Sequence, residues 1–562
     1  MTGIKAFLDM LADAGVEHIF GNPGTTELPL NDALLAQSDI QYILALQECP
    51  ALAISDGYAM AGRRLGVSNL HSACGLGNAM GMLYNAYREG TPLLVTAGQQ
   101  DRRLKFEEPI ICGDMISVVR PWTKWAVEVD RIQDLPSAIR RAVQTALTPP
   151  TGPVFMSLPV DLQMEQADLD LTPARPLDRR VRPPTEALRQ AVAVLQAADK
   201  PAILVGSRVA EADAVKELVA VAEQLGAAVI SESGTTHGRL GFPPAHPQYA
   251  GGLPLWSSEM HSQLAEFDVL LVTGMDLMRH YLYHEPTAIP NGVRIVHLDE
   301  DPWQLGKNFP LAVGLIGDTK SGLAELAHLL AESMTADQIA IAGQRRFQLA
   351  AAHENAIAEC RTAVNRELNL RPLTPLVAMG SIARALPDDV AVVEEAVTTT
   401  NTTLERLAAL KNTDGYFGHR GWALGWGVNC AIGVQLAWPD RPVLGVIGDG
   451  SLMYGVQGLW TAAHYKIPVT IVVPNNAQYQ ILKIGARGMG LPAARENQFL
   501  GMDLTEPEID FVTLAESLGV RASRVNEPDE LTAAVTESLA GDEPRLIEVA
   551  IGREPPDRLE YG

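Results

Sequence analysis

Two short segments in the last quarter of the chain contain residue types that bind metal ions. Gly448-Asp449-Gly450 follows the apolar run RPVLGVI, and Asn475-Asn476 ends the run IPVTIVVP. A helical pattern joins these runs, so we predict a βαβ unit in which both polar segments follow parallel strands. Because the carboxyl ends of parallel strands meet at one edge of an open sheet, we expect Asp449 and Asn476 to lie close together.

This combination of groups is suited to a metal ion and a phosphate. A carboxylate, an amide oxygen and a nearby main-chain carbonyl form an oxygen ligand set for Mg²⁺ or Ca²⁺. Gly448 and Gly450 allow close approach of the backbone and can direct N–H groups at a phosphate. A bound metal would bridge the protein to a diphosphate. Gly-Asp-Gly alone is more often a simple turn. The prediction therefore depends on the Asn pair, which follows Gly450 after 24 intervening residues.

A second group of polar residues follows predicted strands near the N-terminus. Gly24 and Thr25 follow HIF, Glu48 follows QYILALQ, and His71 follows VSNL. A single Glu or His in such a place is usually structural, for example a solvated residue at a helix start. Several of them at one sheet edge favour an active site instead. Histidine side chains exchange protons near neutral pH, so His71 is a candidate acid–base group.

The elements that position these residues form three blocks. Short apolar runs alternate with helical patterns, which predicts an α/β fold of three doubly wound parallel-sheet domains. We expect domains at 1–170, 189–340 and 373–562, a Pro- and Arg-rich linker at 171–188, and a helical linker at 341–372. The first and third blocks have similar size and alternation, so their sheets are expected to be related.

The composition excludes several classes of partner. The 562 residues carry a formal net charge of −23, which disfavours nucleic acid and anionic membranes as general partners. Five dispersed cysteines lack metal-ligand spacing and indicate reduced thiols. The first twenty residues read as an amphipathic helix and a strand rather than a signal peptide. A cytoplasmic protein without a membrane span is therefore expected.

The pairing of Gly-Asp-Gly with Asn-Asn resembles the cofactor signature of the thiamine-diphosphate-dependent decarboxylase and acetolactate synthase superfamily. This resemblance implies a pyrimidine-binding first domain, a central domain and a diphosphate-binding third domain. It implies that Asp449, Asn476 and the main-chain carbonyl of Gln478 hold Mg²⁺ or Ca²⁺. The cofactor-binding residues that it implies are Gly24, Glu48, Leu424, Gly448, Asp449, Gly450, Ser451, Asn476 and Tyr479.

The same resemblance gives Glu48 a catalytic role. Thiamine diphosphate loses its C2 proton to its own imino group when a carboxyl group bonds N1′ of the pyrimidine. Glu48 and the following CPALAISDGYAMAG are similar to the family segment that supplies this group. GHRGWALGWGVNCAIG resembles the segment that keeps the cofactor bent, with Leu424 as the wedge between its rings and Trp422 as a further pocket residue.

Within the superfamily the chain is most similar to the benzoylformate decarboxylase type. The segments that carry this likeness include GNPGTTELPL, NLHSACGLGNAMG and PLLVTAGQQ. The likeness puts Thr25 in the place of an active-site serine and His71 in that of the first active-site histidine. A second histidine is expected from the central domain. An ungapped match there gives Tyr281, beside His280 and His284, and the sequence does not choose among these three.

Four residues depart from that pattern. Thr25 replaces the serine and adds a methyl group, and Ala477 stands where the family usually has glycine. Gly485 replaces a pocket phenylalanine, and Ile481 replaces a small residue. These changes leave the cofactor chemistry in place and weaken the expectation of an aryl substrate.

The resemblance therefore implies non-oxidative decarboxylation of a 2-oxo acid to an aldehyde. The alternatives are a carboligase of the acetolactate synthase type, a 2-hydroxyacyl-CoA lyase, and a non-catalytic cofactor-binding relative. A small 2-oxo acid or aldehyde is the expected substrate. At least a homodimer, with a homotetramer favoured, is expected because family members build each site from two subunits. Nothing in the sequence decides whether the central domain binds a nucleotide.

Overall fold

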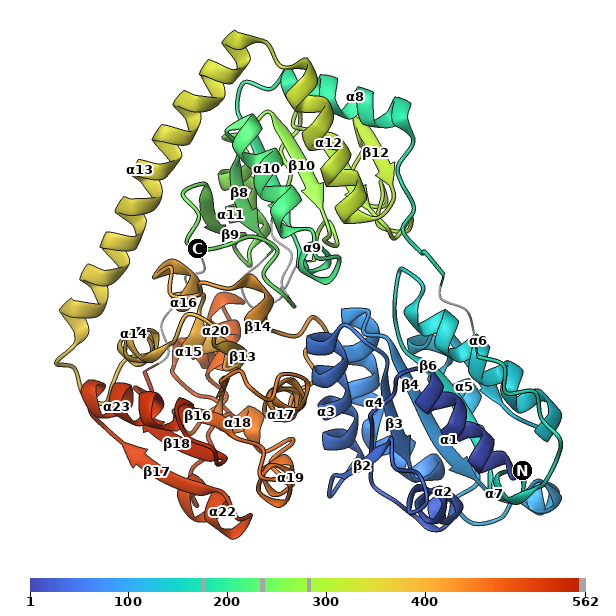
Figure 1. Ribbon diagram of the computed structural model, residues 1–562. Coiled ribbons are helices and arrows are strands. Elements are labelled where there is room, and N and C mark those ends of the chain that lie inside the picture. The colour runs from blue at the N-terminus through green and yellow to red at the C-terminus, as the bar shows by residue number, and fades with distance from the viewer. Residues whose placement is uncertain (174–176, 233–237, 280–284, 555–562) are drawn as a thin grey trace.

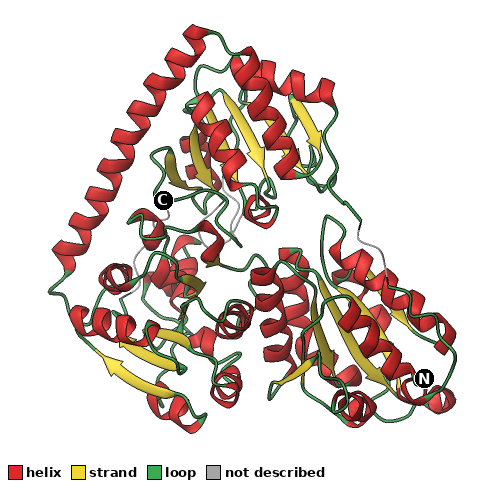
Figure 2. Ribbon diagram, in the orientation of Figure 1, coloured by secondary structure: helices red, strands yellow, loops and turns green. Residues whose placement is uncertain are grey.

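The computed structural model describes residues 1–173, 177–232, 238–279 and 285–554. It contains three six-stranded parallel sheets with helices on their faces, as predicted for the fold class (Figures 1 and 2). We call them the N-terminal, central and C-terminal domains by these sheets, whereas the exact domain limits given above stay predictions. No helix among the described residues is long and apolar enough to cross a membrane.

The N-terminal sheet has the strand order β2-β1-β3-β4-β6-β5. Its strands are β1 (His18–Gly21), β2 (Gln41–Leu44), β3 (Gly66–Leu70), β4 (Leu93–Gln99), β5 (Trp125–Glu128) and β6 (Val154–Pro159). Its helices are α1 (Gly3–Asp13), α2 (Leu28–Leu34), α3 (Glu48–Gly62), α4 (Ser72–Glu89), α5 (Met115–Val119), α6 (Leu135–Leu147) and α7 (Val160–Met164). Every residue of β3, β4 and β6 is buried, which explains their continuous apolar character.

The C-terminal sheet repeats that order as β14-β13-β15-β16-β18-β17. Its strands are β13 (Ala391–Glu395), β14 (Tyr416–Phe417), β15 (Val443–Ile447), β16 (Val469–Asn475), β17 (Arg521–Val525) and β18 (Arg545–Ala550). Its helices are α14 (Pro375–Ala385), α15 (Val397–Thr400), α16 (Thr403–Arg406), α17 (Trp426–Ala437), α18 (Asp449–Leu452), α19 (Gly458–Tyr465), α20 (Gln480–Gly488), α21 (Pro492–Arg495), α22 (Phe511–Ser517) and α23 (Pro528–Leu539). The two outer domains thus share one topology.

The central domain has a different order, β12-β11-β10-β7-β8-β9, which is a doubly wound sheet with its switch point between β7 and β10. Its strands are β7 (Pro201–Val205), β8 (Ala228–Ser231), β9 (Tyr249–Gly252), β10 (Val269–Thr273), β11 (Arg294–Asp299) and β12 (Val313–Ile316). Its helices are α8 (Thr185–Gln196), α9 (Ser207–Glu211), α10 (Val215–Leu225), α11 (Ser257–Leu264) and α12 (Thr319–Ser333). The 32-residue helix α13 (Ala336–Glu367) runs along the outside to the C-terminal domain (Figure 1).

The outer domains are joined by helices α3 and α17, which follow equivalent strands of the two sheets and lie side by side (Figure 1). Glycine is needed at this crossing. A Cβ on Gly57 would lie 2.3 Å from the Cys430 carbonyl oxygen, and one on Gly433 would lie 2.0 Å from that of Ile54. One continuous apolar core therefore extends through both outer domains.

Candidate active site

The carboxyl end of the N-terminal sheet brings His71 and Glu27 together. His71 stands at the N-cap position of α4 directly after β3, but its side chain makes no capping hydrogen bond, and its Nδ1 lies 2.7 Å from Glu27 Oε2. Glu27 is only 1% exposed and also accepts hydrogen bonds from the main-chain N–H groups of Gly24 and Gly98. Because Glu27 is an acceptor, Nδ1 of His71 carries the hydrogen, and Nε2 is left for proton exchange.

Glu27 was missed by the sequence analysis, and Thr25 does not join its network. Thr25 is exposed, whereas the neighbouring Thr26 is buried and lies 2.9 Å from Ser72 Oγ. The predicted residue Gly24 is close to the imidazole, because a Cβ there would lie 2.0 Å from His71 Nδ1. The capping pattern GTTE, with Glu three residues after Gly24, is the one sequence signal that points to Glu27.

Glu48 is the first residue of α3 and is 6% exposed, so it is not a solvated residue at a helix start. Its Oε2 accepts a hydrogen bond of 3.0 Å from Asn78 Nδ2. A Cβ on Gly75 would lie 2.6 Å from Oε1, so α4 presses its first turn against this carboxyl group. His280, Tyr281 and His284 lie outside the described residues.

In the C-terminal domain, Asp449 follows β15 and is 5% exposed. Its two carboxylate oxygens accept hydrogen bonds from the main-chain N–H groups of Gly450, at 2.8 Å, and Ala477, at 2.6 Å. Burial raises the pKa of Asp449 to about 6, although main-chain N–H groups around it favour the ionised form. The N–H of Gly448 is used inside the protein, since it donates to the carbonyl of Glu395.

Asn476 and Gln478 lie beside Asp449 at the end of β16. Asn476 Oδ1 accepts from the Gln478 N–H, while the Gln478 side chain turns away to bond Lys483 and the Arg553 carbonyl. Among the described residues, the carbonyl oxygen of Gln478 accepts no hydrogen bond. Among the residues that the structure describes, no group of three or more His, Cys, Asp or Glu is suited to a metal. The Asp449 carboxylate, the Asn476 amide oxygen and the Gln478 carbonyl oxygen are instead donors of the kind that Mg²⁺ and Ca²⁺ prefer.

The other predicted residues of this half lie around the same strand ends. Tyr479 covers Gly450, where a Cβ would lie 2.7 Å from the phenol ring, and half-buried Ser451 follows on α18. Ala477 has a φ of +51°, a left-handed conformation that favours glycine. The departure noted at this position in the sequence therefore places an alanine under local backbone strain beside Asn476.

Leu424 lies in a segment that is held on both sides. The side chain of Asn85 in α4 bonds both the N–H and the carbonyl of Ala423. The buried carboxyl group of Glu395 accepts from the N–H groups of Gly425, Trp426 and Gly427 and so caps α17. Burial raises the pKa of Glu395 to about 8. These contacts fix the backbone on either side of the candidate wedge residue.

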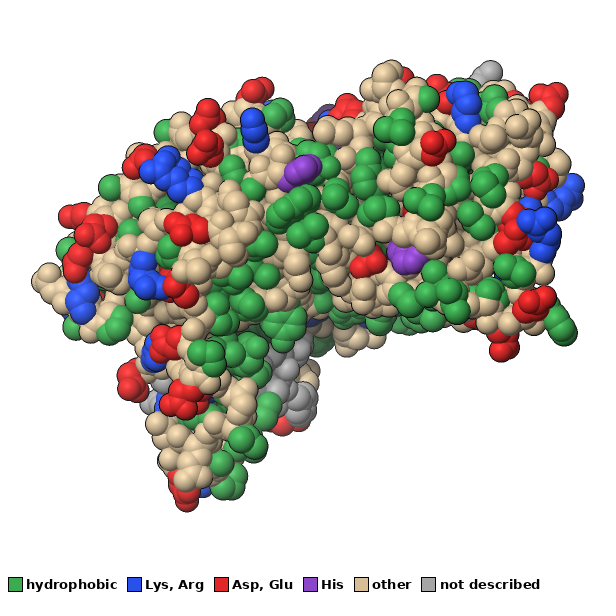
Figure 3. Space-filling view, turned by 90° about the horizontal axis from the view of Figure 1, so that it is seen from below, with side chains coloured by type: hydrophobic (Ala, Val, Ile, Leu, Met, Phe, Trp, Pro, Cys, Tyr) green, Lys and Arg blue, Asp and Glu red, His purple; other side chains and the backbone are tan. Residues whose placement is uncertain are grey.

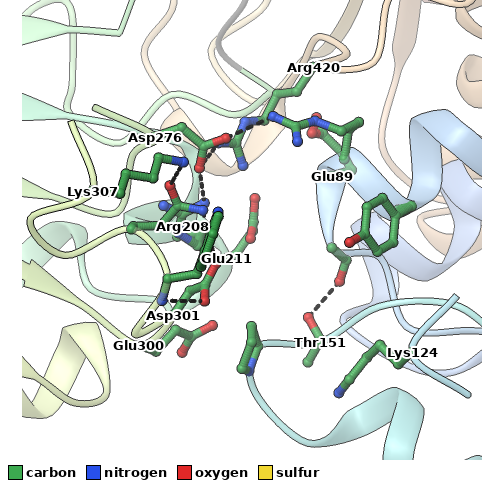
Figure 4. Close-up of a pocket in the computed structure, with 16 residues that line it drawn as sticks. Glu89, Lys124, Thr151, Arg208, Glu211, Asp276, Glu300, Asp301, Lys307 and Arg420 are labelled. Atoms are coloured by element: carbon green, nitrogen blue, oxygen red, sulfur yellow. Dashed lines mark hydrogen bonds and ion pairs between the residues drawn. The ribbon is translucent and has the colours of Figure 1, made fainter. Parts of the chain in front are cut away.

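A separate cavity of about 340 Å³ lies where the three domains meet (Figure 4). Asp276, after β10, pairs with Arg88 at the end of α4, with Arg208 after β7 and with Arg420 of the C-terminal domain, at 2.9, 2.9 and 3.1 Å. Although burial favours its protonated form, Arg420 and Arg208 hold the pKa of Asp276 below its ordinary value. This ion cluster ties the domains together, and nothing in the sequence spacing predicted it.

Comparison with known protein families agrees with this arrangement. The model of the thiamine pyrophosphate enzyme N-terminal TPP binding domain matches residues 1–109. The central-domain model of the same enzymes matches residues 188–326, and the C-terminal TPP binding domain matches residues 396–549. The two TPP-binding models thus fall within the two outer domains, whose sheets share a topology.

Individual relatives match over nearly the whole chain. Benzoylformate decarboxylase of Pseudomonas aeruginosa is 32% identical and covers 97% of this chain and 98% of its own. The acetolactate synthase large subunit of Haemophilus influenzae is 26% identical over 96% of this chain and 92% of its own.

Two solved structures have the same architecture. The thiamine diphosphate-dependent 4-hydroxybenzoylformate decarboxylase of Rhodococcus jostii RHA1 has a TM-score of 0.85 and 29% identity, covering 99% of this chain and 100% of its own. The benzoylformate decarboxylase from Polynucleobacter necessarius has a TM-score of 0.87, with the same identity and the same coverage. Sequence, topology and the two strand-end sites lead to one conclusion: the chain belongs to the thiamine pyrophosphate enzyme family.

Proposed function

We propose that the protein is a Mg²⁺-dependent decarboxylase that converts a 2-oxo acid to an aldehyde without oxidation. The observation that carries this proposal is the buried Glu48, which accepts a hydrogen bond from Asn78. In the same domain the His71 imidazole is hydrogen-bonded to the Glu27 carboxylate. The similarity to benzoylformate decarboxylase at 32% identity supports it over the acetolactate synthase relatives.

Each half of the site has its own task in this proposal. Thiamine diphosphate, when bound, accepts the electron pair that remains when CO₂ leaves the substrate. Asp449, Asn476 and the Gln478 carbonyl hold the metal that neutralises the diphosphate. Glu48 holds a proton at the pyrimidine N1′, which activates the cofactor.

Substrate handling is assigned to the polar strand ends. Nε2 of His71 exchanges a proton with the reacting substrate, while Glu27 orients the ring. Thr25 binds the substrate carboxylate. A side chain from 280–284 is also proposed to reach the substrate, but it lies outside the described residues. Leu424, between its two anchored neighbours, supports the bent cofactor.

We also infer that two copies of the chain are needed. Among the described residues, no hydrogen bond joins Glu48 or His71 to Asp449 or Asn476. Leu46 and Tyr454, close in sequence to the two half-sites, are exposed, and apolar side chains gather across the face of the molecule seen from below (Figure 3). A second copy that covers the exposed Leu46 and Tyr454 would bring opposite half-sites together, and a homotetramer would pair two such dimers.

A product assay tests the proposed activity. Protein loaded with thiamine diphosphate and Mg²⁺ is incubated with aryl and aliphatic 2-oxo acids, and CO₂ and aldehyde are measured together. We expect equal amounts of both from at least one substrate. An acyloin in place of free aldehyde would identify a carboligase, and protection from heat by an acyl-CoA would identify a lyase. Cofactor binding without turnover of any substrate would indicate that the protein is a non-catalytic, cofactor-binding relative.

A further inference from the structure

A second cavity lies where the end of α13 meets α14 and the segment that follows α16 (Figure 1). Its volume is about 400 Å³, and small-molecule pockets usually measure about 300–1,000 Å³. One face of α13, with Arg361 and Val364, and one face of α14, with Gly380 and Ala383, border it. The cavity shares no lining residue with the candidate active site or with the three-domain cavity.

The interior of this cavity is apolar, and its space comes from small lining residues. Val364 and Leu407 line it and are buried with Cys360 in a small apolar cluster. The two helices touch at one point, because a Cβ on Gly380 would lie 2.8 Å from Val364 Cγ1. Four lining residues have no side chain or a single methyl group, namely Gly380, Ala383, Ala408 and Ala409. An apolar chain or ring therefore fits the space that they leave.

The charged residues of the lining are mostly cationic. They are Arg361, Arg384 and Lys411, with Asp388 as the single carboxylate among them. Arg384 pairs with Asp529 at 3.1 Å, whereas Arg361 and Lys411 form no ion pair within the described part of the chain. The whole chain has a net charge of −23, so a cavity with excess positive charge is a distinct place of attraction for an anion.

We propose that this cavity binds an organic carboxylate that has an apolar chain or ring. The carboxylate group binds Arg361 and Lys411, and the apolar part fills the space beside Val364 and Leu407. Such a ligand contacts α13 and the C-terminal domain at once, so it stabilises their attachment. Simple fatty acids and 2-oxo acids with an apolar side chain share this chemistry. The inference does not depend on the proposed function.

Titration of the cofactor-loaded protein with octanoate tests the proposal. We expect saturable binding by calorimetry and a higher melting temperature at saturation. Acetate, which lacks the chain, and octan-1-ol, which lacks the charge, should bind at least about ten-fold more weakly. Rising salt should weaken octanoate binding because it screens the ion pairs. Absence of saturable binding at millimolar octanoate would overturn the inference.

Variants of the lining locate the binding. Arg361 and Lys411 are exposed, so Arg361→Glu and Lys411→Glu should fold, and each should weaken octanoate binding about ten-fold by replacing attraction with repulsion. The matched control is Arg346→Glu, which makes the same charge change at an exposed residue of α13 outside the lining. Ala383→Phe fills the cavity without changing its charge and should also weaken binding about ten-fold.

The outcomes separate this cavity from the candidate active site. If octanoate binds equally to the wild type, to both charge variants and to Ala383→Phe, it binds elsewhere and the inference is overturned. Weaker binding in these variants, with unchanged turnover of 2-oxo acids, supports it. Turnover is measured separately, so a wild-type protein that releases no CO₂ would contradict the proposed function and leave this inference standing.

A parallel titration with 2-oxooctanoate distinguishes the two sources of ligand. Equal affinity for octanoate and 2-oxooctanoate would assign the cavity to apolar carboxylates in general. A preference for the 2-oxo acid that disappears in Arg361→Glu would assign it to the substrate class of the proposed reaction. A preference that persists in Arg361→Glu and Ala383→Phe belongs to another site and would count against the inference.

Discussion

The two outer domains have one strand order and use it for different chemistry. In the N-terminal domain the strand ends carry side chains that bond one another, as in the pairs His71–Glu27 and Asn78–Glu48. In the equivalent place of the C-terminal domain, Asp449 is surrounded by main-chain N–H groups. Side-chain networks suit proton movement, whereas a carboxylate fixed by backbone suits metal and phosphate binding.

This contrast predicts different kinetic effects for the two halves. Damage to the N-terminal half should reduce kcat and leave cofactor affinity intact. Damage to the C-terminal half should weaken cofactor retention first.

The largest effect is expected from Glu48→Gln. The amide cannot supply the acidic proton at N1′, so kcat should fall by about 10³-fold, within the usual range for a lost acid–base group. Cofactor affinity, measured by calorimetry, should change little. Asn78→Ala keeps the carboxyl group and should cost only about ten-fold. Near-normal turnover by Glu48→Gln would refute its role.

Asp449→Asn should show the opposite pattern. Loss of the anionic metal ligand should weaken apparent Mg²⁺ and cofactor affinity by about 100-fold. At saturating metal and cofactor, much of kcat should return. Gel filtration followed by cofactor analysis measures the retention directly. If the variant retains the cofactor but has lost kcat, Asp449 acts in catalysis rather than in cofactor binding, and the contrast is contradicted.

Mixing these two variants tests whether the halves come from different subunits. The assay uses metal and cofactor concentrations too low to restore Asp449→Asn. After co-refolding, hybrid dimers contain one site built from two intact halves. Random pairing should therefore restore about a quarter of the wild-type activity. Refolding each variant alone is the control. If each site were formed within one chain, the mixture would stay as inactive as its components.

A smaller effect is expected at Glu27, which acts through His71. Glu27→Gln keeps the shape but replaces the charged acceptor of the imidazole bond, and kcat should fall by about 10- to 30-fold with unchanged cofactor affinity. Glu27→Asp should recover part of this loss. A parallel loss of cofactor affinity would indicate that Glu27 has a structural role instead.

The smallest effect concerns stability. The pKa of Glu395 is about 8 in the folded protein against an ordinary 4.5, so the folded state holds an extra proton between these values. Its contribution is therefore present at low pH and is lost as pH rises from 4.5 to 8. In Glu395→Gln the decline of unfolding free energy over pH 5–8 should be shallower by at most about 1.4 kcal/mol per pH unit. Parallel urea-denaturation curves at each pH would contradict this.

Local patterns in the sequence were sufficient to predict the three parallel sheets and to select residues at their strand ends. Glu48 and Asp449 could be found because apolar strands and turn residues mark where a strand stops. Asn85 could not be found, because its partner Ala423 lies 338 residues away and only the tertiary packing brings them together. Glu27 was marked only by the capping pattern GTTE, which gives no sign of its contact with His71. Ala477 is an intermediate case. The sequence showed that alanine replaces the usual glycine, but only the structure showed that its backbone is left-handed.

Helix α13 joins the central domain to the C-terminal domain and is 32 residues long, a span of about 48 Å. Each inserted or deleted residue would change its reach by about 1.5 Å and rotate one attachment point against the other by about 100°. The residue count of the helix thus sets both the distance between its two attachment points and their relative rotation. Substitutions of its solvent-facing side chains leave the two attachment points in place, whereas an insertion or deletion moves one against the other.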